Sequence, residues 1–143
     1  MELAIDSRLF NDGAFIVTRF TGTITGEQLI EFLFRLVQSA GTSIPASYRQ
    51  LIELGGLQQL SMDEDTLHRI AHINKSYGAH RGRVMTAFVT DNPQYRGLAQ
   101  MHKMLSGFAG VEVEVFDDTD QACRWLQVEL PEFDSGVAWP GTG

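Results

Sequence analysis

The sequence predicts a single α/β domain with a mixed sheet, in which parallel strands follow an antiparallel hairpin. Residues 83–126 carry the strongest signal, because two strand-like runs are each followed by a helix-like run. Strands separated by single helices pair in parallel, since the crossover helix returns the chain to the same end of the sheet. Residues 3–20 contain two further strand-like runs separated by Asn11-Asp12-Gly13, a turn signal typical of a tight hairpin.

The expected order is strand, strand, helix, strand, helix, strand, helix, strand, helix, which gives about five strands and about four helices. Thr25 with Gln28, and Ser61 with Glu64, match the capping-box pattern of helix starts, and Asp118 precedes the last helix. The expected strands are residues 3–10, 14–20, 49–54, 83–89 and 111–116, and the helices begin near residues 26, 61, 93 and 118 and end near residues 40, 77, 106 and 126.

Glycine and proline indicate where these elements end. Gly55-Gly56 is expected to break the third strand, and Gly78 is expected to cap the second helix. We expect one domain over residues 1–128 and a C-terminal tail over residues 129–143, which is loose because its last dozen residues are rich in glycine. Phe133 and Trp139 are the side chains that could tether this tail to the domain.

Composition excludes several classes of function. The chain has 143 residues, of which 43% are hydrophobic, so it is long enough for one well-formed core. A net charge of −7 argues against nucleic acid as a partner, since phosphate contacts need clustered Lys and Arg. Cys123 is the only cysteine, no run of about 18 apolar residues suggests a membrane span, and the first residues do not resemble a signal peptide. These features predict a cytoplasmic protein.

Two stretches of the chain have the pattern of a known family. One is residues 50–61, QLIELGGLQQLS; the other is residues 84–101, VMTAFVTDNPQYRGLAQM, continued by residues 111–126, VEVEVFDDTDQACRWL. They resemble the STAS domain, in particular an uncharacterised bacterial branch similar to the sporulation anti-anti-sigma factor and also described as STAS/SEC14. The resemblance covers about residues 1–128. It implies an anti-anti-sigma-factor-like fold and a regulatory role exerted by binding another protein.

The resemblance departs from the family at its phosphorylation switch. Anti-sigma-factor antagonists carry Asp-Ser-Ser/Thr-Gly at the start of the second helix, and the second hydroxyl is phosphorylated. The matching positions here are Ser61-Met62-Asp63-Glu64, so Asp63 replaces the switch hydroxyl and the glycine is missing as well. Either the chain is fixed in a charged state or it belongs to a branch without this switch, and the missing glycine favours the second interpretation.

No motif for catalysis, a metal or a cofactor is present in the sequence. His68 and His72 are spaced for metal binding, but they fall on a polar helix face without the glutamate of an H-E-x-x-H motif, which favours a solvated pair. Acidic residues are expected along the carboxyl ends of the parallel strands, where they would complement helix dipoles or form a cation site or a docking surface for a basic partner. They are Asp63, Glu64, Asp65, Asp91, Asp117, Asp118 and Asp120.

The first helix is apolar over about 200° of its surface, which is wider than the stripe of a little over 100° that a core-facing surface helix needs. Three interpretations remain open. The helix could be buried on two sides, it could line a lipid-like cavity, or it could drive self-association through Phe32 and Phe34 with Met101 and Met104 nearby.

The first functional hypothesis is a non-enzymatic regulatory or protein-interaction module that forms a homodimer and needs no cofactor. Its protein partner would dock on Gly56, Leu57, Ser61, Asp63, Glu64, Asp91, Asn92 and Pro93. The alternative is a carrier or sensor of a small apolar or lipidic ligand in a SEC14-like cavity, and a third is a weak enzyme that uses the acidic residues. A carrier needs an apolar cavity between helices and sheet, a partner module needs an exposed apolar patch, and an enzyme needs a polar pocket with convergent titratable groups.

Overall fold

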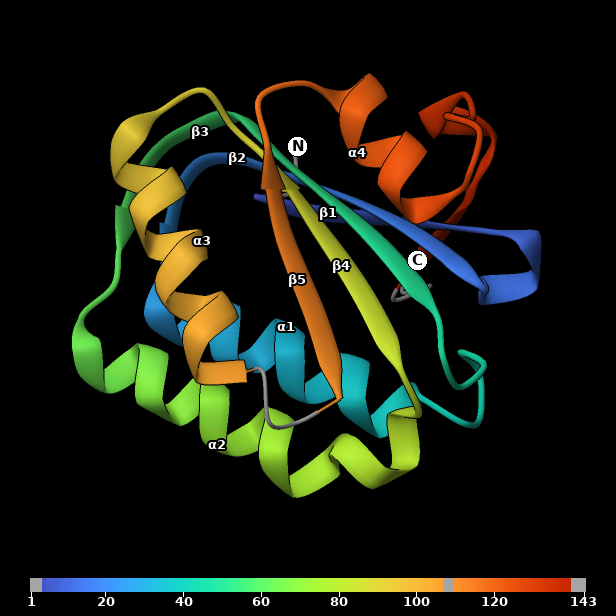
Figure 1. The fold of residues 1–143 in the computed structure, drawn as a ribbon, viewed down its shortest axis with the longest axis horizontal. Coiled ribbons are helices and arrows are strands. Elements are labelled where there is room, and N and C mark those ends of the chain that lie inside the picture. The colour runs from blue at the N-terminus through green and yellow to red at the C-terminus, as the bar shows by residue number, and fades with distance from the viewer. Residues whose placement is uncertain (1–3, 107–109, 140–143) are drawn as a thin grey trace.

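The computed structural model describes residues 4–106 and 110–139, with the backbone alone at 77–81 and 106. A six-stranded sheet in the order β5-β4-β3-β2-β1-β6 carries helices on both faces (Figure 1). The strands are β1 (Ile5–Phe10), β2 (Phe15–Thr25), β3 (Arg49–Ser61), β4 (Val84–Val89), β5 (Val111–Phe116) and β6 (Val137–Trp139). The helices are α1 (Gly26–Ser39), α2 (Glu64–Arg81), α3 (Pro93–Ser106) and α4 (Thr119–Leu126).

The pairing confirms the predicted α/β fold with a mixed sheet. Strands β2, β3, β4 and β5 are parallel to one another, and β1 is antiparallel to both β2 and β6. The turn between β1 and β2 is a short 3-10 segment in which Asn11 and Asp12 have positive φ. The capping box at α1 is also present, because the Thr25 side chain accepts from the Gln28 backbone and Gln28 accepts from the Thr25 backbone.

Strands β2 and β3 are longer than expected and remain paired to their ends. The prediction that Gly55-Gly56 breaks the third strand was wrong, because β3 continues to Ser61, which pairs with Thr25 of β2. A Cβ atom at Gly56 would lie 2.9 Å from the Thr21 side chain, so glycine allows β2 to approach here. The register shifts between Arg19 and Thr21, and the pair of strands bends away from the rest of the sheet (Figure 1).

Helices α1 and α2 begin side by side because the ends of β2 and β3 are paired. A Cβ atom at Gly26, the first residue of α1, would lie 2.6 Å from the Thr66 hydroxyl of α2. The two helices are also joined by an exposed ion pair between Glu27 of α1 and Arg69 of α2, 2.7 Å apart. The two helices therefore begin next to each other, at the paired ends of β2 and β3.

The limits of α2 differ from the predicted ones at both ends. Its N-cap is Asp63 rather than Ser61, because β3 occupies the chain as far as Ser61. The helix also runs past the predicted cap at Gly78 and ends at Arg81, with Gly82 as its C-cap.

Alternating residues of the sheet face two different layers. One layer packs under α4 and the C-terminal segment, and its buried residues are Phe15, Val17, Leu51, Ala87, Ala122, Cys123, Leu126 and Phe133. The opposite face carries α1 and α3, and α2 packs across these two helices and stands away from the sheet (Figure 1).

The expected loose tail is partly folded in the structure. Residues 133–135 form a 3-10 turn, and β6 adds to the sheet beside β1, with Leu9 opposite Val137. Phe133 is buried, and the guanidinium carbons of Arg8 and Arg19 lie 4.8 and 4.0 Å from its ring centre. Trp139 packs edge-on against Phe32 of α1, which confirms the two expected tethers.

Among the described residues, no helix combines the length and the apolar character that crossing a bilayer requires.

Candidate functional site

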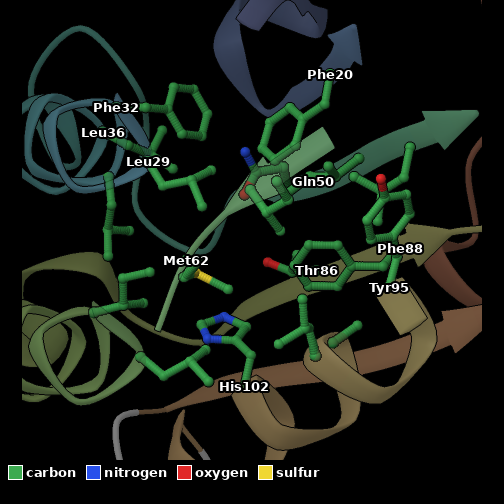
Figure 2. A pocket seen from close by; sticks show the side chains of 18 of the residues that line it. Phe20, Leu29, Phe32, Leu36, Gln50, Met62, Thr86, Phe88, Tyr95 and His102 are labelled. Carbon is green, nitrogen blue, oxygen red and sulfur yellow. The ribbon is translucent and has the colours of Figure 1, made fainter. Parts of the chain in front are cut away.

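A cavity of about 120 Å³ lies between the sheet and helices α1, α2 and α3 (Figure 2). All three helices and four of the strands contribute to its wall. The lining residues are Phe20, Leu29, Phe32, Leu33, Leu36, Tyr48, Gln50, Ile52, Leu54, Leu57, Leu60, Met62, Leu67, Ile70, Asn74, Thr86, Phe88, Tyr95, Leu98, Ala99, His102 and Val111.

The cavity follows from the position of α2. Helices α1 and α3 lie directly on the sheet, whereas α2 spans them from the outside. Side chains such as Leu67 and Ile70 of α2 therefore reach inward between the two flanking helices without closing onto the strands. Four residues of the wide apolar face of α1 also line the cavity, which supports the cavity interpretation of that face; they are Leu29, Phe32, Leu33 and Leu36.

The wall is apolar almost throughout, and none of its described residues is an aspartate, glutamate, lysine or arginine. Polar side chains of the lining include Gln50 of β3, which lies opposite Thr86 of β4 in the parallel register, Asn74 of α2 and His102 of α3. Further along β3 the inward residues are apolar, namely Ile52 and Leu54. The strand floor is therefore polar at the start of β3 and apolar further along the strand.

Gln50 is buried in the middle of the sheet, with 3% of its surface exposed. Among the described residues, no group accepts a hydrogen bond from its Nε2 atom. Figure 2 shows the amide turned toward the side of the cavity formed by α1, where Leu29 is labelled. A buried amide donor without an acceptor is unusual, because nearly all buried polar groups in folded proteins form hydrogen bonds.

His102 and Phe88 form the part of the wall next to α3. Their rings are 5.8 Å apart and almost perpendicular, which is a favourable edge-to-face arrangement. Both side chains are only half-buried, as are Leu60, Met62 and Leu98. The cavity is therefore not sealed from solvent on the side of α2 and α3.

The residues predicted to bind a protein partner lie in two segments that border this cavity. Gly56, Ser61, Asp63 and Glu64 are exposed along the end of β3 and the start of α2, whereas Leu57 is buried and lines the cavity. Asp91, Asn92 and Pro93 are exposed at the start of α3. The segments meet inside the protein, since Leu57 and Tyr95 belong to one core cluster.

Asp63 acts as the N-cap of α2. Its Oδ1 atom accepts hydrogen bonds from the backbone N and from the hydroxyl of Thr66, both 2.9 Å away. The backbone bond, followed by the hydroxyl bond and the charge of Arg69, lowers the pKa of Asp63 from its ordinary value of 3.8. The carboxylate is thus ionised and used in capping.

The acidic residues do not gather along a single rim as predicted. Because β3 is long, α2 begins far along the bent strand pair, away from the loops that follow β4 and β5 (Figure 1). Asp118 caps α4, and Asp117 pairs with Arg96. No group of His, Cys, Asp or Glu in the described chain is arranged to hold a metal ion, and His68 and His72 are exposed.

The four residues predicted for self-association do not share one surface. Phe32 faces inward, where it packs edge-on against Phe20. Phe34 is exposed on α1, and Met101 and Met104 are exposed on α3, with α2 packed against both helices. Met104 is the most exposed of them, at 77%.

The family model for SpoIIAA-like proteins matches residues 15–127, so the chain belongs to the SpoIIAA-like family and is a STAS-like domain. An uncharacterised DUF3478-family protein from Shewanella loihica PV-4 with a SpoIIAA-like fold is 19% identical, with a TM-score of 0.55 over 88% of this chain and 97% of that one. The anti-sigma factor antagonist SpoIIAA, in its unphosphorylated form, is 14% identical, with a TM-score of 0.54 over 87% of this chain and 98% of that one. These two structures establish a shared fold. No curated protein matches the chain.

The capping role of Asp63 predicts a contribution to stability that depends on pH. Because the pKa is lowered by folding, the contribution is complete above the ordinary value of 3.8 and is lost as the pH falls through the folded-state pKa. Asp63→Asn keeps a capping acceptor but removes the charge, so the variant should be less stable near pH 6 and approach the wild type toward pH 2. Urea unfolding at a series of pH values measures this difference.

Asp65→Asn is the matched control, because Asp65 is exposed in the same first turn and does not cap the helix. Its stability difference from the wild type should change much less with pH. Parallel stability curves for Asp63→Asn and the wild type over this range would contradict the role assigned to the Asp63 carboxylate.

Proposed function

We propose that this protein is a non-enzymatic regulatory module of STAS type that senses a small apolar ligand in the cavity between the sheet and helices α1, α2 and α3. The observation that carries the proposal is the cavity itself, with its apolar wall. Such a site suits binding through the hydrophobic effect, which scales with the apolar surface removed from water. Among the three hypotheses raised by the sequence, the carrier or sensor is the one that requires this feature.

The composition of the wall favours binding over chemistry. Catalysis by proton transfer or nucleophilic attack needs titratable side chains that converge on one point. The described wall contains no carboxylate, lysine or cysteine, and its histidine, His102, stacks against Phe88. A ligand bound here is therefore held rather than transformed.

Protein partners dock, in this proposal, on the exposed segments that border the cavity. Met62, which lines the cavity, lies between Ser61 and Asp63, and Leu57 follows Gly56. Tyr95 likewise lies in the cavity wall, two residues after Pro93. A ligand that shifts these inward side chains changes the outward neighbours that a partner contacts.

Ligand occupancy then takes the place of the phosphorylation switch of related antagonists. Asp63 has no hydroxyl to phosphorylate, and its carboxylate is already committed to Thr66. The exposed carboxylates of Asp63, Glu64 and Asp91 favour a partner with a basic surface. A cytoplasmic location is part of the proposal and rests on a composition with a single cysteine.

Self-association is proposed through α3 alone, where Met101 and Met104 are exposed one helical turn apart. Native mass spectrometry of the purified protein should show a dimer, and Met104→Glu should convert it to a monomer, because the charge would be buried at the contact. Gln121→Glu, at an exposed position of α4 on the opposite face of the sheet, is the control for added charge. A monomer in the wild type would contradict this contact.

Benzene is a suitable first probe, because an engineered apolar cavity of roughly 150 Å³ is known to bind it. Methyl signals of Leu57, Ile70 and Leu98 should shift in a saturable way during an NMR titration, whereas Leu126, on the other face of the sheet, should not respond. Ala99→Leu places a larger side chain in the cavity and should weaken benzene binding about tenfold or more, while leaving the fold intact.

Gln100→Leu is the matched control, since it introduces the same side chain on the exposed face of the same helix. It should bind benzene as the wild type does. Absence of saturable shifts in the wild type, or shifts that persist unchanged in Ala99→Leu, would refute the proposed ligand site.

A further inference from the structure

We infer that the cavity selects small uncharged molecules that carry one hydrogen-bond acceptor, such as a ketone or ester carbonyl oxygen, and that the Nε2 group of Gln50 donates to this acceptor. The inference rests on the proposed function and adds the chemical class of the ligand. It is carried by Gln50, a buried amide in the strand floor of a largely apolar site.

Gln50 is well placed to act as the recognition group. Its backbone is held on both sides, because it pairs with Ile16 of β2 and with Thr86 of β4. With 3% of its surface exposed, the side chain has little access to bulk water, and its Nε2 finds no acceptor among the described residues. A ligand oxygen would satisfy a donor whose burial otherwise costs free energy.

The surroundings of Gln50 define how the ligand lies. Thr86 is its neighbour on the next strand, so the polar atom of the ligand belongs at this end of the cavity. Its apolar part then extends along β3 toward Ile52, Leu54 and Met62. In this orientation the polar atom of the ligand lies beside Gln50, and the apolar part of the ligand lies beside apolar side chains.

Charge and size restrict the ligand further. A carboxylate or an ammonium group is disfavoured, because the described wall contains no ionised partner for it and burying an unpaired charge is very unfavourable. The volume of about 120 Å³ is close to that of the engineered cavity that binds benzene. A molecule of about six or seven heavy atoms is therefore accommodated without expansion of the fold.

Cyclohexanone and methylenecyclohexane provide a direct test, because they have nearly the same shape and differ in whether an oxygen is present to accept a hydrogen bond. The wild-type protein should bind cyclohexanone about tenfold more tightly, and the side-chain amide signals of Gln50 should shift on binding in ¹⁵N NMR spectra. Gln50→Met keeps the shape but removes the donor, so the preference for cyclohexanone should be lost or reversed, because its oxygen would be buried without a hydrogen bond. Gln59→Met, at an exposed position of the same strand, should retain the wild-type preference.

The possible results separate this inference from the proposed function. Equal binding of the two probes by the wild type would overturn the role of Gln50 and leave the apolar site standing. A preference for cyclohexanone that persists in Gln50→Met would also overturn it, because another group would be the donor. If neither probe bound and benzene also failed, the proposed function itself would be wrong.

Discussion

The paired extension of β2 and β3 is the constraint on which the rest of the structure depends. The two strands stay hydrogen-bonded until Thr25 lies opposite Ser61, so α1 and α2 must begin at the same place. Glycine at positions 26 and 56 permits this, because a side chain at Gly26 would collide with Thr66 and one at Gly56 with Thr21. An α2 that begins beside α1 cannot also lie flat on the sheet, so it packs across α1 and α3.

The candidate site is a direct consequence of that arrangement. Where α2 stands away from the strands, the floor of the sheet is left facing a space lined by side chains from three helices. Leucine, isoleucine and phenylalanine side chains occupy most of the space between the helices and the sheet, and the part that stays open is the cavity. Retaining such a space costs packing energy, since protein interiors are otherwise close-packed. A buried amide donor in the same place adds to that cost, and a ligand that fills the space and accepts the hydrogen bond recovers both.

Much of the fold could be predicted from local patterns in the sequence. The alternation in residues 111–116 and the helix starts at Thr25 and Asp118 depend on near neighbours, and the structure confirms them. Gly55-Gly56 was misjudged because glycine weakens an isolated strand, whereas here the approach of Thr21 requires it. The cap of α2 was misplaced for a related reason. Both Ser61 and Asp63 have the residue type of a cap, and the choice depends on where β3 ends.

The candidate site was only partly predictable. The broad apolar face of the first helix indicated surplus apolar surface, and one of its three interpretations was a cavity. Gln50 carried a weaker signal, because it alternates with Ile52 and Leu54 and therefore occupies an inward position of a buried strand. No local pattern in the sequence predicts that α2 packs on α1 and α3 instead of on the sheet, because this position depends on contacts between residues that are distant in the sequence.

The proposed function requires that the space between the sheet and helices α1, α2 and α3 be an apolar cavity able to hold a ligand. A crystal structure determined under xenon pressure is the most direct test of this requirement. Xenon occupies dry apolar cavities of this size because it is attracted by dispersion and needs no hydrogen bonds. We expect a strong xenon peak between the sheet and the three helices, close to Leu57, Ile70 and Leu98. If xenon does not bind here, because the helices have closed onto the sheet or because ordered water fills the space, the space is not an apolar cavity able to hold a ligand.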